Sequence, residues 1–427
     1  MNFMIKTAGI IVLIASFIHL SGQVVEGGNG HALILDKQGS VWAVGRNNYG
    51  QLGDSSLENS PVPKKVKGLN NIVKIARGYD HSIALDAKGD LYLWGRNNYG
   101  QLGFSPGQDF LKPHKLENHT GFIAVEGGHC HSVGLKKDGT VLSWGHNYFG
   151  ELGNGTREHA SWPVPVLQKS GAVVSPVSEV IQIASVGYHT LALKKDGTIW
   201  AWGSNVYNEL GHKGNELELY AMHIEGIPPI KEIAVGWHHS VALDTSGKIW
   251  VWGSDPAFQF NEATTKQYGQ PVCFDNFPKF TKIACGSWHS LAIDEHKNVW
   301  AWGKNHYGML GTNDTISCSK PVLIKPLKNI IEIGGGCFQS ITVDVSGKIF
   351  TFGDNPSGQL GRGDFKRCYS PQLMTLDMNG QLSEAALSFT KKKTALSTSE
   401  IVSYITLFLS ICLNFILFRK LKKLARA

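Results

Sequence analysis

Histidine is the residue type in this chain whose spacing first suggests chemistry. An imidazole can bind a metal or move a proton near neutral pH. A metal site needs three or four ligands that converge from different positions, whereas these histidines occupy one place in successive copies of a repeat. We therefore expect them to make hydrogen bonds at a strand end, and we predict no metal site, cofactor or catalytic residue. The six are His31, His81, His131, His189, His239 and His289.

Other signs of catalysis are missing from the sequence. There is no G-x-S-x-G elbow, Walker loop, H-E-x-x-H helix or paired-carboxylate arrangement. The seven cysteines include no C-x-x-C pair. Cys318 and Cys368 stand 50 residues apart, in equivalent positions of neighbouring repeats, where side chains point in parallel and not at each other. We predict that the protein is not an enzyme.

The elements that position these residues come from an internal repeat. The segment HSIALDAKGDLYLWGRNNYGQLG begins at His81, and counterparts begin at the other five histidines and at Gln339. The seven starting points lie 50, 50, 58, 50, 50 and 50 residues apart. The longer interval falls in the third unit, where we expect a surface loop within 168–180.

Each unit predicts four short strands. The first is a stretch such as 230–236, and it is followed by an alternating strand such as 239–244. A turn with a glycine such as Gly247 comes next, and then a third strand, for example 299–303 in the sixth unit. An N-x-x-G-Q-L-G loop and a proline-marked edge strand complete the unit. Four strands repeated radially describe a propeller blade. We predict an all-β, seven-bladed β-propeller of repeats of about 50 residues, with one C-terminal transmembrane helix.

The repeat resembles a known one. The pattern G-x-x-H-S-x-A-L-D-x-x-G-x-[VI]-W-x-W-G-x-N-x-x-G-Q-L-G is similar to that of the regulator of chromosome condensation family, and it covers nearly everything between the two hydrophobic ends. The resemblance implies a seven-bladed propeller. Departures occur at Val44 in place of an aromatic residue, at Lys297 in place of the turn glycine, and at 254–260 in place of the fifth loop. We expect these to loosen local turns without changing the fold.

Charge argues against nucleic-acid binding. The formal charge of +7 is concentrated near the ends, and residues 24–385 carry a net charge of −1. Such a body lacks the basic surface that phosphate binding needs. We predict no nucleic-acid partner.

The two ends are predicted to be membrane-directed. Residues 1–22 combine one basic residue, an apolar run and small residues, as a signal peptide does, and the alternative is an uncleaved anchor helix. A propeller over 23–390 and a juxtamembrane linker over 391–400 would follow. Ile401 to Phe418 is 18 residues without a charge and predicts a transmembrane helix, with 419–427 as a basic cytoplasmic tail. This topology places the propeller on the extracellular, lumenal or periplasmic side.

Candidate binding residues lie at equivalent positions of the repeats that carry different residue types. Two residues precede each repeat's starting point, and this slot should fall in a turn on one face of the ring. Exposed aromatic residues are enriched at binding hot spots, and the alternative is that they pack on neighbouring loops. The patch should be weakest at Asn29 and Gly30. The candidate partner-binding residues are Tyr79, Tyr188, Trp237, Trp288 and Phe338.

Two functions follow as hypotheses. The first is a membrane-anchored, extracytoplasmic module that recognises a protein partner through its aromatic loop face. The second is implied by the family resemblance: guanine-nucleotide exchange on a small GTPase, which requires a cytosolic propeller.

Overall fold

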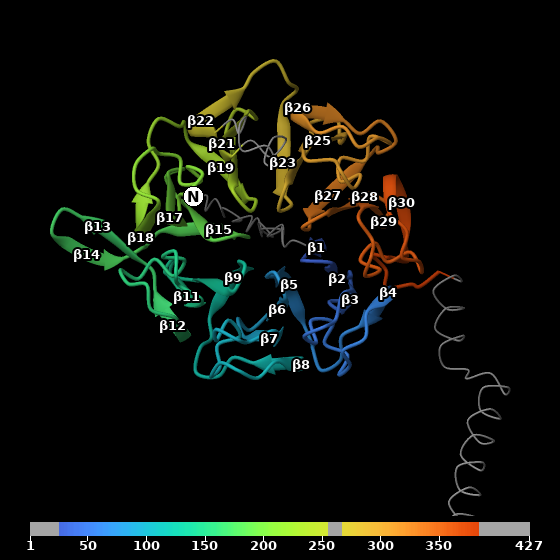
Figure 1. Ribbon diagram of the computed structural model, residues 1–427, viewed down its shortest axis with the longest axis horizontal. Coiled ribbons are helices and arrows are strands. Elements are labelled where there is room, and N and C mark those ends of the chain that lie inside the picture. Colours follow the sequence, from blue (N-terminus) through green and yellow to red (C-terminus); the bar gives the residue numbers. More distant parts are fainter. Residues whose placement is uncertain (1–24, 255–266, 384–427) are drawn as a thin grey trace, which may run out of the picture.

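A computed structural model describes residues 25–254 and 267–383. These residues form seven sheets arranged radially around a central axis, as Figure 1 shows. The predicted all-β, seven-bladed propeller is confirmed. The predicted signal peptide, linker, transmembrane helix and tail lie outside the described residues. Within the described ranges, no helix has the length and apolar character needed to cross a membrane.

Each blade is a meander that runs from the centre of the ring to its edge. Blade 1 consists of β1 (Val25–Gly27), β2 (His31–Leu35), β3 (Val41–Gly45) and β4 (Ser60–Lys65). Blade 2 consists of β5 (Ile72–Arg77), β6 (His81–Asp86), β7 (Leu91–Gly95) and β8 (Phe110–Lys115). Blade 3 consists of β9 (Phe122–Gly127), β10 (His131–Lys136), β11 (Val141–Gly145) and β12 (Ala160–Pro165).

The other blades repeat this order. Blade 4 contains β15 (Val180–Ser185), β16 (His189–Lys194), β17 (Ile199–Ser204) and β18 (Leu217–His223). Blade 5 contains β19 (Ile230–Val235), β20 (His239–Asp244), β21 (Ile249–Ser254) and β22 (Gln267–Phe274). Blade 6 contains β23 (Phe280–Cys285), β24 (His289–Asp294), β25 (Val299–Gly303) and β26 (Cys318–Leu323). Blade 7 contains β27 (Ile330–Gly335), β28 (Gln339–Asp344), β29 (Lys348–Gly353) and β30 (Cys368–Asp377).

The extra residues of the third unit lie at the surface where the sequence placed them, but they form a hairpin and not an irregular loop. Strands β13 (Leu167–Ser170) and β14 (Val173–Pro176) pair with each other and project from the ring in Figure 1. Gln168 also pairs in parallel with Ala221 of β18. The hairpin therefore extends the sheet of blade 4 at its outer edge to six strands.

Tight turns connect the second and third strands of each blade. The glycine in this turn has a positive φ, for example 90° at Gly247 and 87° at Gly347. Glycine adopts this conformation without steric cost. Lys297 adopts it as well, with φ 61°, so the departure seen in the sequence leaves the turn intact.

The hydrophobic core is divided among the blade interfaces. Seven buried clusters occur among the described residues, one between each pair of neighbouring blades. The second tryptophan of the W-x-W-G motif belongs to them: Trp252 is fully buried, and its Nε1–H donates to the carbonyl oxygen of Glu209 in blade 4 at 2.7 Å. Trp250 packs half-buried against the same cluster. Both tryptophans therefore pack one blade against the next.

The ring closes between blades 7 and 1 without a shared sheet. Strand β1 pairs with β2, and β30 pairs with β29. The seam is held by the Cys337 amide, which donates to the Gly28 carbonyl at 3.1 Å, and by a cluster that joins Val25 to Met374. Each blade is thus built from one continuous stretch of chain.

Candidate recognition face

The slots and the N-x-x-G loops lie on the same face of the ring. In each blade, the carbonyl of the second slot residue accepts a hydrogen bond from the amide that follows the W-x-W-G glycine. The Ser204 amide donates to Tyr188, and the Lys304 amide donates to Trp288, both at 2.9 Å. We call this surface the recognition face.

Backbone hydrogen bonds join the slots from one blade to the next. The Tyr79 amide donates to Gly128 at 3.1 Å, and the Trp237 amide donates to Ser287 at 2.9 Å. The slot backbone is therefore fixed before any partner arrives. A preformed surface loses little entropy when it binds.

Four of the five predicted residues gather into one group. Tyr79 of blade 2 lies 5.2 Å from Trp237 of blade 5, between ring centroids, although two blades separate them along the chain. Trp237 stacks on Trp288 at 5.4 Å and lies 6.3 Å from Tyr188. We call Tyr79, His129, Tyr188, Trp237 and Trp288 the aromatic cluster.

The fifth predicted residue lies apart. The ring of Phe338 contacts Tyr307 at 5.2 Å between centroids, and no ring contact joins it to the aromatic cluster among the described residues. All five predicted residues are half-buried, whereas Trp252 and Trp302 are buried. The cluster members also pack on neighbouring loops, as the alternative interpretation had it. Whether they bind a partner stays a prediction.

Comparison with known proteins identifies the repeat. The model of the RCC1-like domain matches residues 107–401, and that of the regulator of chromosome condensation (RCC1) repeat matches residues 38–85. A second model of the same repeat matches residues 24–51 and 72–101. The chain belongs to the RCC1-like domain family.

Solved structures share the fold at low identity. Human WBSCR16 is 22% identical, with a TM-score of 0.68 over 79% of this chain and 93% of that one. Yeast RCC1 (Prp20), in a structure with Kap60 bound, is 20% identical, with a TM-score of 0.70 over 88% of this chain and 89% of that one. Prp20p from Saccharomyces cerevisiae is 20% identical, with a TM-score of 0.67 over 78% and 85%.

The aromatic cluster of this RCC1-like propeller includes a residue that the sequence did not single out. His129 occupies a slot of blade 3 and lies 4.6 Å from Tyr79 and 4.9 Å from Tyr188. The N-x-x-G loop of blade 3 adds Tyr148, which is 58% exposed, and Phe149, which contacts Tyr188 at 5.1 Å. Counting every ring in the slots and in the adjoining loop would have found them.

On blades 1 and 2 the recognition face carries charged side chains as well as aromatic ones. Asp80 lies 3.6 Å from Arg46 and 3.4 Å from Arg96, and the Arg96 guanidinium covers the ring of Tyr49 at 4.5 Å. Burial raises the pKa of Asp80, although both arginines oppose the shift. Ion pairs between Asp80 and the two arginines therefore occupy the face beside Asn29 and Gly30.

Blades 3 and 4 carry buried carboxylates beneath the face. Glu151 and Glu209 stand where blades 1 and 2 have glutamine. Glu151 lies 2.6 Å from Nδ1 of His146, and Glu209 lies 3.4 Å from Nδ1 of His238. Burial would raise the pKa of both carboxyl groups, but hydrogen bonds from these histidines bring the pKa below its ordinary value. The pairs fix two imidazoles beside the aromatic cluster.

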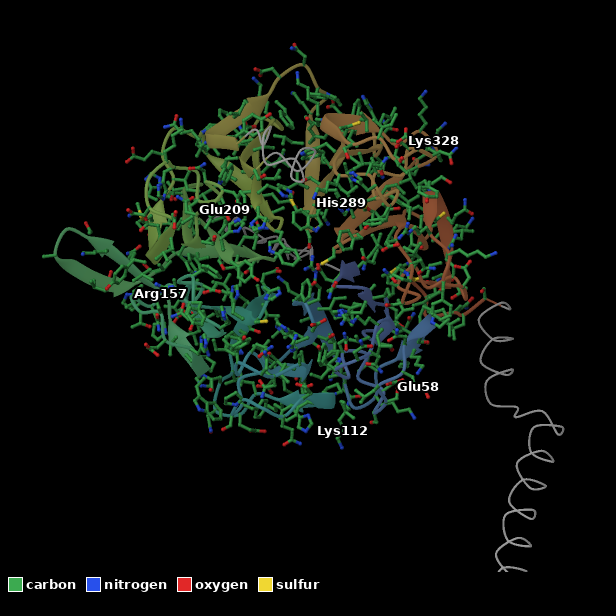
Figure 2. All side chains as sticks on the ribbon, in the orientation of Figure 1. Glu58, Lys112, Arg157, Glu209, His289 and Lys328 are labelled. Atoms are coloured by element: carbon green, nitrogen blue, oxygen red, sulfur yellow. The ribbon has the colours of Figure 1, made fainter. Side chains whose placement is uncertain are left out.

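The six repeated histidines hold neighbouring blades together. Nε2 of His239 lies 2.9 Å from the Ser290 hydroxyl of the next blade, and Nε2 of His289 lies 2.7 Å from that of Ser340. Burial lowers the pKa of all six, to about 3 or about 4. Figure 2 shows His289 inside the ring and Lys328 at its outer edge. The predicted strand-end hydrogen bonding is confirmed.

Gln339 breaks the histidine series for a reason visible in the structure. The next blade has Ala32 where the others offer a hydroxyl, so an imidazole there would lack its partner. The Gln339 amide donates instead to the carbonyl of His31 at 3.0 Å. Among the described residues, no group of three histidine, cysteine, aspartate or glutamate side chains is placed to hold a metal ion.

Proposed function

We propose that this propeller is a membrane-anchored, extracytoplasmic recognition module that binds a protein partner through its recognition face. The observation that supports it most is the gathering of Tyr79, Tyr188, Trp237 and Trp288 from four blades over one face. Large half-buried aromatic residues on a fixed backbone are the usual anchors of a protein interface. Related propellers have protein partners: Kap60 is bound to yeast RCC1, and Prp20p binds Gsp1p and histones.

The location is proposed from the two ends of the sequence. An apolar stretch over Ile401 to Phe418 followed by five basic residues is typical of a stop-transfer anchor. Together with a signal-like N-terminus, it would leave the propeller outside the cytosol.

A second candidate is guanine-nucleotide exchange on a small GTPase. The likeness to Prp20p, which binds Gsp1p, favours it, although that likeness concerns the fold. This candidate needs the propeller on the cytosolic side, so the side of the membrane separates the two.

Protease protection of sealed membrane vesicles, using the full-length protein, tests the location. We expect the propeller to resist protease added to the cytosolic side until detergent opens the vesicles. A chain truncated after Ser397 should be released as a soluble propeller. Digestion of the propeller in sealed vesicles would contradict the proposed side, and a truncated chain that stays in the membrane would show that residues 1–22 act as an anchor.

Capture of partners by the purified full-length protein tests the recognition face. Trp237→Ala and Trp288→Ala should each abolish capture, because losing a hot-spot anchor costs about 2 kcal/mol or more of binding free energy. Val173→Ala is the control, since Val173 is 67% exposed on β14, in the hairpin at the outer edge of blade 4. Retained capture in both face variants, or loss in the control alone, would place the binding surface elsewhere.

A further inference from the structure

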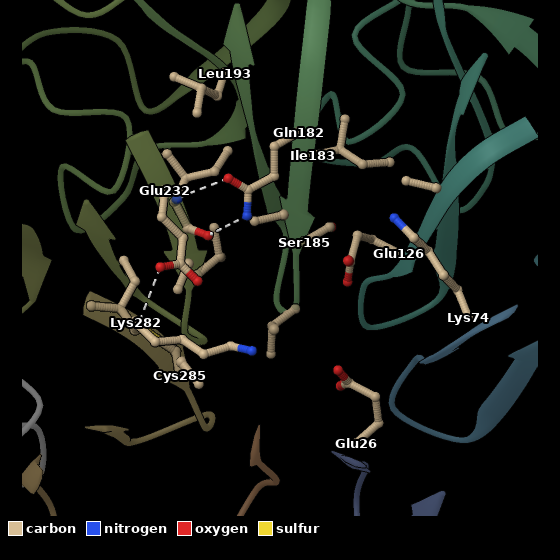
Figure 3. Close-up of a pocket in the computed structure, with 18 of the residues that line it drawn as sticks. Glu26, Lys74, Glu126, Gln182, Ile183, Ser185, Leu193, Glu232, Lys282 and Cys285 are labelled. Carbon is tan, nitrogen blue, oxygen red and sulfur yellow. Dashed lines mark hydrogen bonds between the residues drawn. The ribbon is translucent and has the colours of Figure 1, made fainter. Parts of the chain in front are cut away.

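The centre of the ring contains a cavity of about 520 Å³ that the recognition face does not use. Residues from all seven innermost strands line it: β1, β5, β9, β15, β19, β23 and β27. Its wall combines aliphatic side chains such as Ile183 and Leu193 with charged ones, as Figure 3 shows. Cavities of this size suit a small organic ligand or one long side chain.

Two carboxylates enter this cavity where other blades have small residues. Glu26 on β1 pairs in the ladder with Leu33, and Glu126 on β9 pairs with Val133. The same register position holds alanine or glycine in the other five blades: Ala76, Ala184, Ala234, Ala284 and Gly334. Figure 3 shows the carboxylates of Glu26 and Glu126 in the same open space.

Glu26 is nine-tenths buried and incompletely satisfied. It is 7% exposed, and its Oε2 lies 3.8 Å from Nε of Arg77. Its Oε1 accepts no hydrogen bond from the described residues. A buried carboxylate oxygen without a donor is costly. A donor brought by a ligand would remove that cost.

Among the described residues, no cation of the cavity wall donates a hydrogen bond to Oε1 of Glu26. Arg77 donates through Nη2 to the Gly335 carbonyl at 2.9 Å, and Lys282 pairs with Glu332 at 2.5 Å. Lys74 faces Glu126 in Figure 3. Burial nevertheless raises the pKa of Glu26 to about 7 and that of Glu126 well above its usual range, against the attraction of Arg77 and Lys74. The wall carries Lys74, Arg77, Lys231 and Lys282 against Glu26, Glu126 and Glu232, so its charges nearly balance, yet Oε1 of Glu26 has no donor among the described residues.

We propose that the central cavity binds a ligand with an alkylammonium group, held between Glu26 and Glu126. An ammonium group carries three donors and one positive charge, so it could donate to Oε1 of Glu26 and to Glu126 at the same time and offset the repulsion between the two carboxylates. No metal-binding group of three such side chains occurs among the described residues, so an organic cation suits the site better than a metal ion. The aliphatic wall would cover the carbon chain. This inference is independent of the recognition face.

Calorimetric titration of the full-length protein with 1,5-diaminopentane tests the proposal. We expect saturable binding at pH 8 that weakens at pH 6, since protons compete with the cation for the carboxylates. The charged groups that line the cavity or act on these carboxylates are Arg77 and Lys74 from β5, Lys231 and Glu232 from β19, Lys282 from β23 and Glu332 from β27; the pKa of Glu232 is also raised to about 7 by burial, so Glu232→Gln controls for its protonation. Proton release at pH 7, measured in buffers of different ionisation enthalpy, should accompany binding.

Variants distinguish binding in the central cavity from binding at the protein surface. Glu126→Gln should lower the affinity about tenfold or more, as loss of a charge-assisted hydrogen bond does; Glu126 makes no ion pair with a described residue, so the fold should persist. Glu26→Gln should act in the same direction. Glu58→Gln, at the outer edge in Figure 2, should leave the affinity unchanged.

Other ligands decide what kind of group is bound. Absence of binding at pH 8, equal affinity in Glu126→Gln, or equal binding of 1,5-pentanediol would each overturn the proposal. Displacement of the diamine by Ca²⁺ at lower concentration would indicate a metal site and would also overturn it. Competition by an acetylated peptide with one lysine would support the ammonium site and assign it to a partner's side chain.

Discussion

Lys297 shows at the scale of one residue how the repeat tolerates departures. It holds φ at 61° in a turn where the other six blades place glycine. A side chain in this left-handed region costs about 1–2 kcal/mol, partly offset because glycine is more flexible in the unfolded chain. We therefore expect Lys297→Gly to raise the free energy of unfolding by about 0.5–1 kcal/mol in urea titrations.

Lys88→Gly provides the control for this prediction. Lys88 lies in the corresponding turn of blade 2, one residue before Gly89, and it is not among the residues with positive φ. Glycine at this position would relieve no backbone strain in the folded state and would add flexibility to the unfolded chain. Equal effects in the two variants would show that Lys297 is not strained.

Single residues also show what the sequence could and could not predict. The slots were predicted from the frame of the repeat, but contact between Tyr79 and Trp237 depends on ring closure, which brings blades 2 and 5 together. Glu26 and Glu126 were overlooked because each looks like an ordinary strand residue. Their significance emerges only beside the alanines at the same position in other blades.

The blade interface is the element that stabilises this fold, and its two tryptophans are unequal. Trp252 is buried between blades 4 and 5, whereas Trp250 is half-buried, with Nε1–H donating to Asp244 of its own blade at 3.0 Å. Trp252→Ala should cost about 3–5 kcal/mol of unfolding free energy, as core truncations do. Trp250→Ala should cost less than half as much.

Thermal and urea unfolding of both variants measure this difference. Trp237→Ala belongs in the same series, because a binding residue of the recognition face should leave the midpoint nearly unchanged. A larger loss of stability from Trp237→Ala than from Trp252→Ala would mean that the aromatic cluster is a packing element and not a binding one.

The repeat predicted the strands and turns of each blade, but it did not predict the hairpin β13–β14. Period, turn glycines and prolines predicted four strands per blade. The hairpin β13–β14 was missed because it occurs in one copy, so no frame identifies it. Val173 and Val174 are exposed, and the hairpin joins the sheet through a single bridge at Gln168. Its position depends on tertiary contact rather than on a local pattern.

Across the whole molecule, the buried histidines make stability depend on pH. Their pKa falls to about 3 or about 4 in the folded protein, against about 6.5 in an unfolded chain. The unfolded chain therefore binds more protons below pH 6.5, and stability is lost as the pH falls toward 4. Glu26 and Glu232, with pKa raised to about 7 by burial, hold protons in the folded state and offset part of this loss.

His239→Gln tests this dependence, since blade 7 already uses glutamine at that position. Each titrating histidine contributes about 1.4 kcal/mol per pH unit. The slope of unfolding free energy between pH 6 and 5 should therefore decrease by about that amount in urea titrations at several pH values. His296→Gln, in an exposed turn, should keep the wild-type slope. An unchanged slope in His239→Gln would mean that this imidazole is protonated in the folded protein.

Closure without a shared sheet has a mechanical consequence. A load applied through the C-terminal end of the propeller first reaches Met378, whose carbonyl accepts a hydrogen bond from the Lys37 amide of blade 1, and then β30, which is the outer edge of blade 7 and pairs with β29 alone. Pulled from Asp377, which pairs with Lys348, the strand is peeled away one residue pair at a time rather than sheared along its length. The innermost strand β1 lies on the far side of the seam, joined to blade 7 by side chains and a few backbone bonds. Tension would thus act on blade 7 and on its seam with blade 1 before it reached the other blades, and the recognition face of blades 2 to 6 would stay intact.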